Sequence, residues 1–344
     1  MAGPVHKKLS GIFTPNMVPL DQADRINEDE LRRYVEWLIK NGISGLYPNG
    51  STGEFTRFSF EERKEIVRIV AEQTGGRVKI LAGAAEANAK TTLEACEYYG
   101  SLGVDAVAIV APFYYKLSTE SVYAYFDEIA RRTPVDITLY NIPQFANPIT
   151  VECIKRLSEH PRIIGIKDSS RDLPFFLNMM NEIAPLRPDF VFLLGCEEML
   201  VPALVMGADG GTIATSGIVP EVIMRMYHLT IRAELAEAVQ IQFKVLQLIK
   251  NLIFGTDFPE GCRAGLEIRG FKMGRGRQPM SASQRCDRQS LRTHLQCLLS
   301  EHGVVEEPPE GCPVRQPAAL AIDRAEIDRI VRNVMDQLRR QGAV

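Results

Sequence analysis

The sequence predicts an α/β fold: a closed (β/α)8 barrel followed by additional C-terminal helices. Eight short apolar segments alternate with amphipathic stretches, and strands that alternate with helices form a parallel sheet. Eight such repeats within about 210 residues favour a closed TIM barrel over an open, doubly wound sheet. The 344-residue chain is long enough for this barrel with extensions.

The expected elements follow one another at a regular interval. Strands are predicted at residues 11–18, 45–48, 78–82, 106–110, 137–140, 163–167, 190–194 and 211–214. Helices are predicted between them at residues 28–40, 60–73, 90–102, 119–132 and 150–159. Ser59 and Glu62 have the spacing of a capping box, which predicts the start of the second helix.

The catalytic barrel is expected at residues 1–219. Residues 220–300 are predicted to form further helices that pack on this barrel. Residues 235–254 are strongly apolar, and Ser281 with Gln284 is expected to cap a last helix. Residues 274–279 form a basic, glycine-rich segment that we interpret as a loop between two helices.

The composition changes at the C-terminus. Residues 301–319 hold four prolines and four glutamates, which predicts a flexible linker. Residues 320–344 are predicted to form an amphipathic helix, because apolar side chains recur there at helical spacing. These are Ile327, Ile330, Val331, Val334, Met335 and Leu338.

Composition excludes several classes of function. The formal net charge of −3 gives no support for nucleic-acid binding. The seven cysteines have no metal-ligand spacing, so we expect no metal site and free thiols in a reducing compartment. We see neither an apolar leader nor a run long enough to span a membrane, and we expect a cytoplasmic protein.

Two polar residues end neighbouring predicted strands. Tyr140 ends one strand and Lys167 ends the next, one strand–helix–strand unit later. In a parallel barrel this places an amine and a phenol side by side at the C-terminal mouth. An amine with an acid/base partner is what imine chemistry on a carbonyl substrate requires. Taken singly, Lys167 can also be a strand-end lysine that reaches solvent, and Tyr140 a packed aromatic residue.

A glycine-flanked loop follows the second strand. Its hydroxyl residues, Ser51 and Thr52, and its backbone N–H groups suit the binding of a carboxylate. The alternative is a capping box from Ser51 to Glu54 without any ligand.

Four motifs in order carry a resemblance to a known family. They are Gly50-Ser51-Thr52-Gly53-Glu54, Tyr140-Asn141-Ile142-Pro143, Ile164-Gly165-Ile166-Lys167 and Gly207-Ala208-Asp209-Gly210-Gly211. The chain resembles the dihydrodipicolinate synthase / N-acetylneuraminate lyase family of pyruvate-dependent class I aldolases over about residues 8–300.

The resemblance implies roles for individual residues. Lys167 is expected to form a covalent imine with a 2-keto acid, so that no cofactor is needed, and Tyr140 to act as acid/base. Gly50, Ser51 and Thr52 are expected to bind the carboxylate, with one hydroxyl relaying protons.

Two further positions follow from the same resemblance. The backbone of Ile213 is expected to face the pyruvyl carboxylate. Tyr114 is expected to reach the site of a neighbouring subunit, although Tyr115 is adjacent and the choice between them stays open. This implies a homo-oligomer, commonly a tetramer built as a dimer of dimers.

The sequence also departs from the synthase pattern. Phe145 stands where synthases have a carboxylate-binding arginine, which argues against that reaction as the true activity, because a ring cannot make a bidentate contact. Glu197, Glu198 and Thr215 can accept hydrogen bonds from substrate hydroxyls, unless the glutamates simply begin a helix.

We therefore expect cleavage or formation of a 2-keto-3-deoxy sugar acid, or a related 2-keto-4-hydroxy acid, with pyruvate and an aldehyde as products. The alternatives are a keto-deoxy sugar acid dehydratase, a dihydrodipicolinate synthase activity, and a barrel that only binds or scaffolds. Intact Lys167 and Tyr140 argue against the last of these.

The tail resembles the encapsulation peptides of enzymes packed into bacterial microcompartments. The apolar stripe and the linker favour docking of residues 320–344 on a shell or partner protein. Packing on the barrel or on another subunit is the second alternative. Binding to a membrane surface is the third, and acids on the polar face argue against it.

Overall fold

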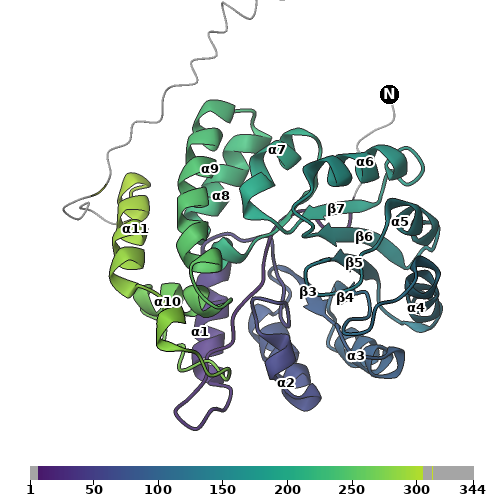
Figure 1. The fold of residues 1–344 in the computed structure, drawn as a ribbon, viewed down its shortest axis with the longest axis horizontal. Helices are drawn as coiled ribbons and strands as arrows, with labels where there is room; N and C mark the ends of the chain where they lie inside the picture. The colour runs from purple at the N-terminus through teal and green to yellow at the C-terminus, as the bar shows by residue number, and fades with distance from the viewer. Residues whose placement is uncertain (1–6, 305–311, 313–344) are drawn as a thin grey trace, which may run out of the picture. The chain divides into compact units, whose positions relative to one another are not determined.

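The predicted (β/α)8 TIM barrel is confirmed. The computed structural model describes residues 7–304 and Cys312, apart from the side chain of Ser283. Eight parallel strands pair in chain order, and β1 closes the barrel on β8 (Figure 1). They are β1 Gly11–Thr14, β2 Gly45–Leu46, β3 Lys79–Gly83, β4 Ala106–Val110, β5 Ile137–Asn141, β6 Ile163–Asp168, β7 Val191–Leu194 and β8 Gly210–Thr212.

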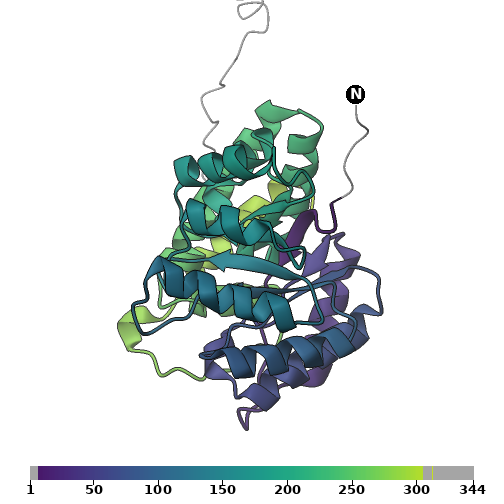
Figure 2. The ribbon, with the colours of Figure 1, turned by 90° about the vertical axis from the view of Figure 1, so that its right-hand side faces the viewer.

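Helices surround the barrel, as the two perpendicular views show (Figures 1 and 2). The first six are α1 Glu28–Lys40, α2 Phe60–Thr74, α3 Ala89–Ser101, α4 Thr119–Arg132, α5 Val151–Ser158 and α6 Leu173–Ile183. The others are α7 Leu200–Val205, α8 Pro220–Ile231, α9 Leu235–Ile249, α10 Glu260–Ile268 and α11 Arg288–Glu301. The capping box of Ser59 and Glu62 begins α2 as predicted.

The strands that matter most for function are β4, β5 and β6, whose residues are all buried. In the register of β5 and β6, Tyr140 lies opposite Lys167 and Asn141 lies opposite Asp168. Because parallel strands end at the same rim, this register brings the phenol and the amine to one edge of the barrel.

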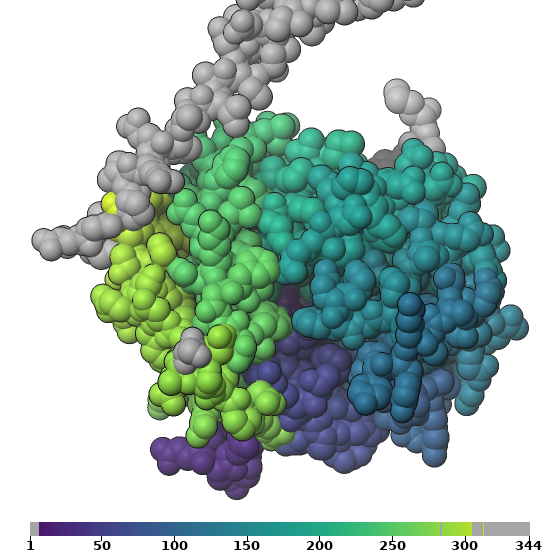
Figure 3. All heavy atoms as spheres, in the orientation of Figure 1, coloured from purple at the N-terminus to yellow at the C-terminus, as the bar shows by residue number. Residues whose placement is uncertain are grey.

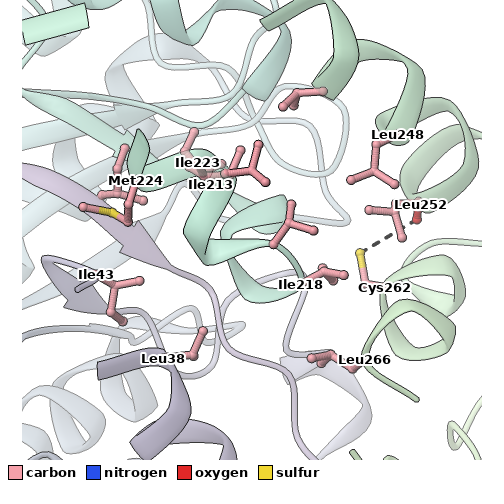
Figure 4. Close-up of a cluster of buried hydrophobic side chains, with 14 of the residues drawn as sticks. Leu38, Ile43, Ile213, Ile218, Ile223, Met224, Leu248, Leu252, Cys262 and Leu266 are labelled. Atoms are coloured by element: carbon pink, nitrogen blue, oxygen red, sulfur yellow. Dashed lines mark hydrogen bonds between the residues drawn. The ribbon is translucent and has the colours of Figure 1, made fainter. Parts of the chain in front are cut away.

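The helices after β8 share a hydrophobic core with one side of the barrel. Figure 4 shows side chains from α1, α8, α9 and α10 in this core. The Cys262 thiol lies beside Leu252, 3.8 Å from its carbonyl oxygen. In this core α9 packs against α8, and α10 packs against the short helix at Ala214–Gly217 that follows β8. The segment that joins α9 and α10 reaches the site described below.

One detail of the C-terminal helices differs from the predictions. The last helix begins at Arg288, and Asp287 caps it by accepting the N–H groups of Gln289 and Ser290, so the predicted cap from Ser281 is wrong. The apolar stretch after residue 235 is not one uniform helix, because α9 ends at Ile249 and a π-helix follows at Lys250–Phe254.

The expectation of free thiols holds for five cysteines, namely Cys96, Cys153, Cys196, Cys262 and Cys286. It is wrong for Cys297 and Cys312, which are disulfide-bonded. The basic segment at residues 274–279 is a loop between α10 and α11, as predicted.

The expected helix at residues 320–344 and most of the expected linker lie outside the described residues. Within the described part of the chain, no helix is both long and apolar enough to cross a membrane.

Candidate active site

A cavity of about 300 Å³ lies at the carboxyl ends of the barrel strands. Its walls come from the loops after β1 and β2, from the ends of β5 to β8, and from the segment after α9. Figure 3 shows a narrow hollow between the green and teal atoms, with purple N-terminal residues at its base. The carboxyl ends of barrel strands are where enzymes of this architecture hold their active sites.

Lys167 and Tyr140 meet in this cavity. The Lys167 amine lies 3.9 Å from the centre of the Tyr140 ring and 4.5 Å from the centre of the Tyr47 ring. Among the described residues no carboxylate lies within ion-pair distance of this amine. It is therefore held by aromatic faces alone and remains available to a carbonyl carbon.

Ser51 joins the pair from the loop after β2. Its hydroxyl lies 3.4 Å from the Tyr140 hydroxyl, and either group can donate. The capping-box alternative is wrong, because the Glu54 carboxylate pairs instead with Arg57 and the buried Arg263. The Ser51 hydroxyl is thus free to face the cavity.

The rest of this loop is packed tightly on the barrel. Thr52 is buried and lines the cavity. Gly50 does not line it, and a methyl group there would contact the Tyr47 ring at 3.3 Å and Pro15 at 3.4 Å. A methyl group on Gly53 would lie 2.8 Å from the backbone oxygen of Asn16, so a glycine is required for this approach.

A hydrogen-bonded pair directly behind the site fixes the ends of β5 and β6. The Asn141 amide donates to Asp168 Oδ1 at 2.7 Å, and the Ser170 hydroxyl donates to Asp168 Oδ2 at 2.7 Å. Burial raises the pKa of Asp168. Asn141 directly follows Tyr140, and Asp168 directly follows Lys167. The hydrogen bond between Asn141 and Asp168 therefore holds the ends of the two strands, and with them Tyr140 and Lys167, at a fixed separation.

Gly195, which directly follows β7, and the hydrogen-bonded pair of Asn141 and Asp168 are two features of the site that the sequence did not predict. A methyl group on Gly195 would lie 2.0 Å from the Ser169 hydroxyl and 3.0 Å from Lys167 Cε. Only glycine leaves room for both side chains, and no motif in a single sequence reveals such a requirement.

The three residues predicted to bind substrate hydroxyls do not lie together in the cavity. Glu197 lines the cavity, whereas the Glu198 carboxylate accepts a hydrogen bond from Arg171 at 2.8 Å and is not among the cavity residues. Thr215 lies behind the wall and donates its backbone N–H to Glu197 Oε1 at 2.8 Å. These three side chains are therefore not brought to one surface.

Ile213 and Phe145 lie on different sides of the site. The Ile213 side chain is buried in the core, its N–H donates to Phe13, and its carbonyl accepts the Ser216 hydroxyl at 2.6 Å. Phe145 lines the cavity mouth and is 62% exposed. Tyr114 lies outside this cavity and is 90% exposed.

Glu197 provides a pH-dependent prediction. Burial raises its pKa above the ordinary value of 4.5, so the folded protein keeps the Glu197 proton to a higher pH than the unfolded chain does. The protonated Glu197 carboxyl therefore contributes to the free energy of unfolding below about pH 4.5, and this contribution is lost as the pH rises through the pKa of the folded state.

We expect Glu197→Gln to match the parent protein in unfolding free energy near pH 4.5 and to become relatively more stable as pH rises, by at most about 1.4 kcal/mol per pH unit. Urea unfolding across this range measures the difference. The exposed Glu94→Gln is the control, and a pH-independent difference for Glu197→Gln contradicts the prediction.

The fold and the site define a class of protein: a barrel with a lysine, a tyrosine and a loop with two hydroxyl residues at its mouth, an arrangement that suits an imine-forming lyase. Comparison with known proteins agrees, because the model of the dihydrodipicolinate synthetase family matches residues 8–298. The chain belongs to this family. It is a pyruvate-dependent class I aldolase, and such enzymes form a Schiff base between lysine and pyruvate without a cofactor.

Several known proteins are similar to this chain. An uncharacterized DapA-like lyase of Pyrococcus furiosus is 30% identical over 264 residues, covering 76% of this chain and 88% of that protein. The structure of a 2-keto 3-deoxygluconate aldolase from Picrophilus torridus is 30% identical, with a TM-score of 0.72, and covers 78% of this chain and 96% of its own.

A third similar structure is YagE, a prophage protein of the dihydrodipicolinic acid synthase family from E. coli K12 in complex with pyruvate. It is 25% identical, has a TM-score of 0.79, and covers 86% of this chain and 99% of its own. Because the family is enzymatic, the alternative of a barrel that only binds or scaffolds is not retained.

Proposed function

We propose that the protein cleaves a 2-keto-4-hydroxy acid, specifically a 2-keto-3-deoxy sugar acid, into pyruvate and an aldehyde, or catalyses the reverse addition. The observation that carries this proposal is the meeting of three groups in one cavity. The Lys167 amine lies 3.9 Å from the Tyr140 ring, and the Tyr140 hydroxyl lies 3.4 Å from that of Ser51.

The proposed chemistry begins with an imine. The Lys167 amine attacks C2 of the keto acid, and loss of water leaves a protonated imine. Tyr140 accepts the proton of the C4 hydroxyl, the C3–C4 bond breaks, and its electron pair moves into the imine to give an enamine. The aldehyde departs, C3 of the enamine takes up a proton, and water hydrolyses the imine to release pyruvate.

The neighbouring groups have supporting roles in this proposal. Ser51 passes protons to and from Tyr140, because the two hydroxyls lie 3.4 Å apart. Thr52 and the backbone of its loop bind the C1 carboxylate, which orients C2 toward Lys167. The main-chain role expected for Ile213 is left out, because its N–H and its carbonyl already have partners.

The sugar-acid substrate is supported by polar groups deeper in the cavity. Ser169, Glu197 and Thr212 line the wall, and the buried Thr212 hydroxyl has no hydrogen-bond partner among the described residues. A buried hydroxyl without a partner is costly unless a ligand supplies one. Similarity to a 2-keto 3-deoxygluconate aldolase points the same way.

A panel of reactions tests the substrate and the two alternatives. We expect 2-keto-3-deoxygluconate to yield pyruvate and glyceraldehyde in equal amounts. Loss of water without pyruvate release indicates the dehydratase. Condensation of pyruvate with aspartate semialdehyde indicates the synthase, against which the position of Phe145 at the mouth argues.

Tyr140→Phe is expected to lower kcat by about 10²- to 10³-fold, because the ring remains but the hydroxyl that moves protons is lost. Tyr47→Phe is the matched control, since Tyr47 also contacts Lys167 through its ring. Steady-state kinetics measure both variants. Equal losses in the two contradict an acid/base role for Tyr140.

A second cavity beside the first is the basis for a proposed oligomer. This cavity, also about 300 Å³, is lined by Ser51, Phe113 and Phe145, among others. Tyr114 is too exposed to serve its own site and has a left-handed backbone with φ +75. We propose that Tyr114 of a second copy enters this cavity and reaches Ser51, in a dimer that pairs into a tetramer.

Mixing two inactive variants tests this exchange. Tyr114→Ala and Lys167→Ala are each expected to be nearly inactive, and subunit exchange between them to restore about a quarter of the parent activity, because a mixed dimer has one complete site. Activity assays after co-refolding measure the recovery. Tyr115→Ala with Lys167→Ala is the control. No recovery from the first mixture contradicts the exchange.

We further propose that the protein is cytoplasmic and that residues 320–344 dock it on a shell protein of a microcompartment. The support is the sequence pattern of this segment alone. Deletion of residues 301–344 is expected to abolish co-localisation with shell proteins. Unchanged localisation contradicts the docking proposal.

A further inference from the structure

Arg171 is a charged residue of the cavity that the proposed chemistry does not use. It follows β6 and lines the same cavity as Lys167. Its Nε donates to Glu198 Oε1 at 2.8 Å, and its guanidinium lies 4.7 Å from the centre of the Phe254 ring. Its side chain is 43% exposed. Its two terminal NH2 groups donate no hydrogen bond to any described residue.

We propose that Arg171 binds an anionic group, a carboxylate or a phosphate, on the aldehyde half of the substrate. This inference rests on the proposed function, in which Lys167 holds C2 and the aldehyde half extends away from it. A guanidinium whose terminal groups are unoccupied presents a planar pair of donors that matches carboxylate and phosphate oxygens.

The charges around the cavity favour a substrate with two negative groups. Lys167 and Arg171 both line it, and Glu197 is its one acidic residue among those described. Burial raises the pKa of Glu197, which lowers the negative charge of this carboxyl at a given pH. Glu198 lies outside the cavity and accepts a hydrogen bond from Arg171 Nε alone, so it does not engage the two terminal NH2 groups.

The backbone holds Arg171 in place before any substrate arrives. Its φ of +62 lies in the left-handed region, which a residue of this kind rarely adopts. The residues on both sides are fixed: the Ser170 hydroxyl donates to Asp168 and accepts the Asp172 N–H, and Asp172 caps α6. An unfavourable conformation kept by its surroundings is common at ligand-binding positions.

The side chain is equally confined. Glu198 contacts it through the hydrogen bond to Nε, and the Phe254 ring lies against the guanidinium. The ring of Phe254 also excludes water from one face of the guanidinium, which strengthens its attraction for an anion. The alternative is that Arg171 only ties Glu198 and Phe254 together.

Aldol addition of pyruvate to matched aldehydes tests the proposal. The phosphate arm compares glyceraldehyde 3-phosphate with glyceraldehyde, and the carboxylate arm compares succinic semialdehyde with butanal. The readout is the ratio of kcat/KM for the charged aldehyde to that for the neutral one. We expect the parent protein to prefer the charged member of at least one pair, and that arm identifies the anion.

Arg171→Gln is expected to lower this ratio by at least about tenfold, and Arg171→Lys, which keeps the charge without the fork, to lower it less. Glu198→Gln is expected to keep or raise the ratio. Arg156→Gln is the matched control, because Arg156 pairs with Glu120 on the outside of the barrel. Borohydride trapping of pyruvate on Lys167 verifies that each variant is folded.

Three outcomes overturn the inference. The first is that the parent protein prefers the neutral aldehyde in both pairs. The second is that Arg171→Gln leaves the ratio of kcat/KM values unchanged. The third is that Glu198→Gln lowers this ratio as much as Arg171→Gln does. In each case a pyruvate adduct on Lys167 leaves the proposed aldolase chemistry intact. Absence of that adduct in the parent protein overturns the proposed function and this inference together.

Discussion

Lys167→Ala is expected to abolish the reaction, with a fall in kcat of at least about 10⁴-fold, because the variant lacks the nucleophile on which the imine forms. The measurement is borohydride reduction in the presence of pyruvate, followed by peptide mass spectrometry. In the parent protein we expect one pyruvyl adduct, on the peptide that carries Lys167. In the variant we expect none.

A matched control separates this effect from general lysine chemistry. Lys155 lies on α5 and pairs with Glu182 at 2.9 Å outside the barrel. Lys155→Ala is expected to keep both the adduct and the activity. Adduct formation at other lysines of the Lys167→Ala protein at the parent rate contradicts the assignment, as does the absence of any adduct in the folded parent protein.

Arg263→Leu is expected to have the largest effect on stability. Arg263 is buried in α10, donates to the backbone oxygen of Met273 at 2.6 Å, and pairs with the equally buried Glu54 from the loop after β2. Loss of the guanidinium leaves a buried carboxylate and a backbone carbonyl without this partner. We expect about 3 kcal/mol less unfolding free energy, since Arg57 still contacts Glu54.

Urea unfolding measures this loss, and a second variant explains its origin. If the cost comes from the unpaired carboxylate, Glu54→Gln in the Arg263→Leu background recovers part of the stability. The exposed pair of Arg232 and Glu234 gives the control, and Arg232→Leu is expected to cost less than about 1 kcal/mol. A similarly small cost for Arg263→Leu contradicts the prediction.

Much of the barrel is readable in the sequence because its signal is local. A buried parallel strand is a short apolar run, and the predicted strand at residues 106–110 agrees with β4 at both ends. The pairing of Tyr140 with Lys167 was also predictable, since residues that end successive parallel strands share a rim. Helix α2 begins where its capping box is encoded in four consecutive positions.

Other features depend on residues that are distant in sequence. Arg263 and Glu54 are 209 positions apart, and no local pattern pairs them. The requirement for Gly195 exists only because Ser169 and Lys167 occupy the space beside it. The same reason applies to the two glutamates. They begin a short helix at Glu197–Met199, which is the alternative given for them, and this helix turns Glu197 into the cavity and Glu198 toward Arg171.

The sequence by itself therefore determined the barrel, its order of strands and the lysine–tyrosine pair, because periodicity and spacing along one chain encode them. Tertiary structure decided which polar side chains face the substrate: it placed Thr215 behind the wall and left the terminal groups of Arg171 uncovered. Side-chain direction at a strand end depends on neighbours from other repeats, and a linear pattern does not contain them.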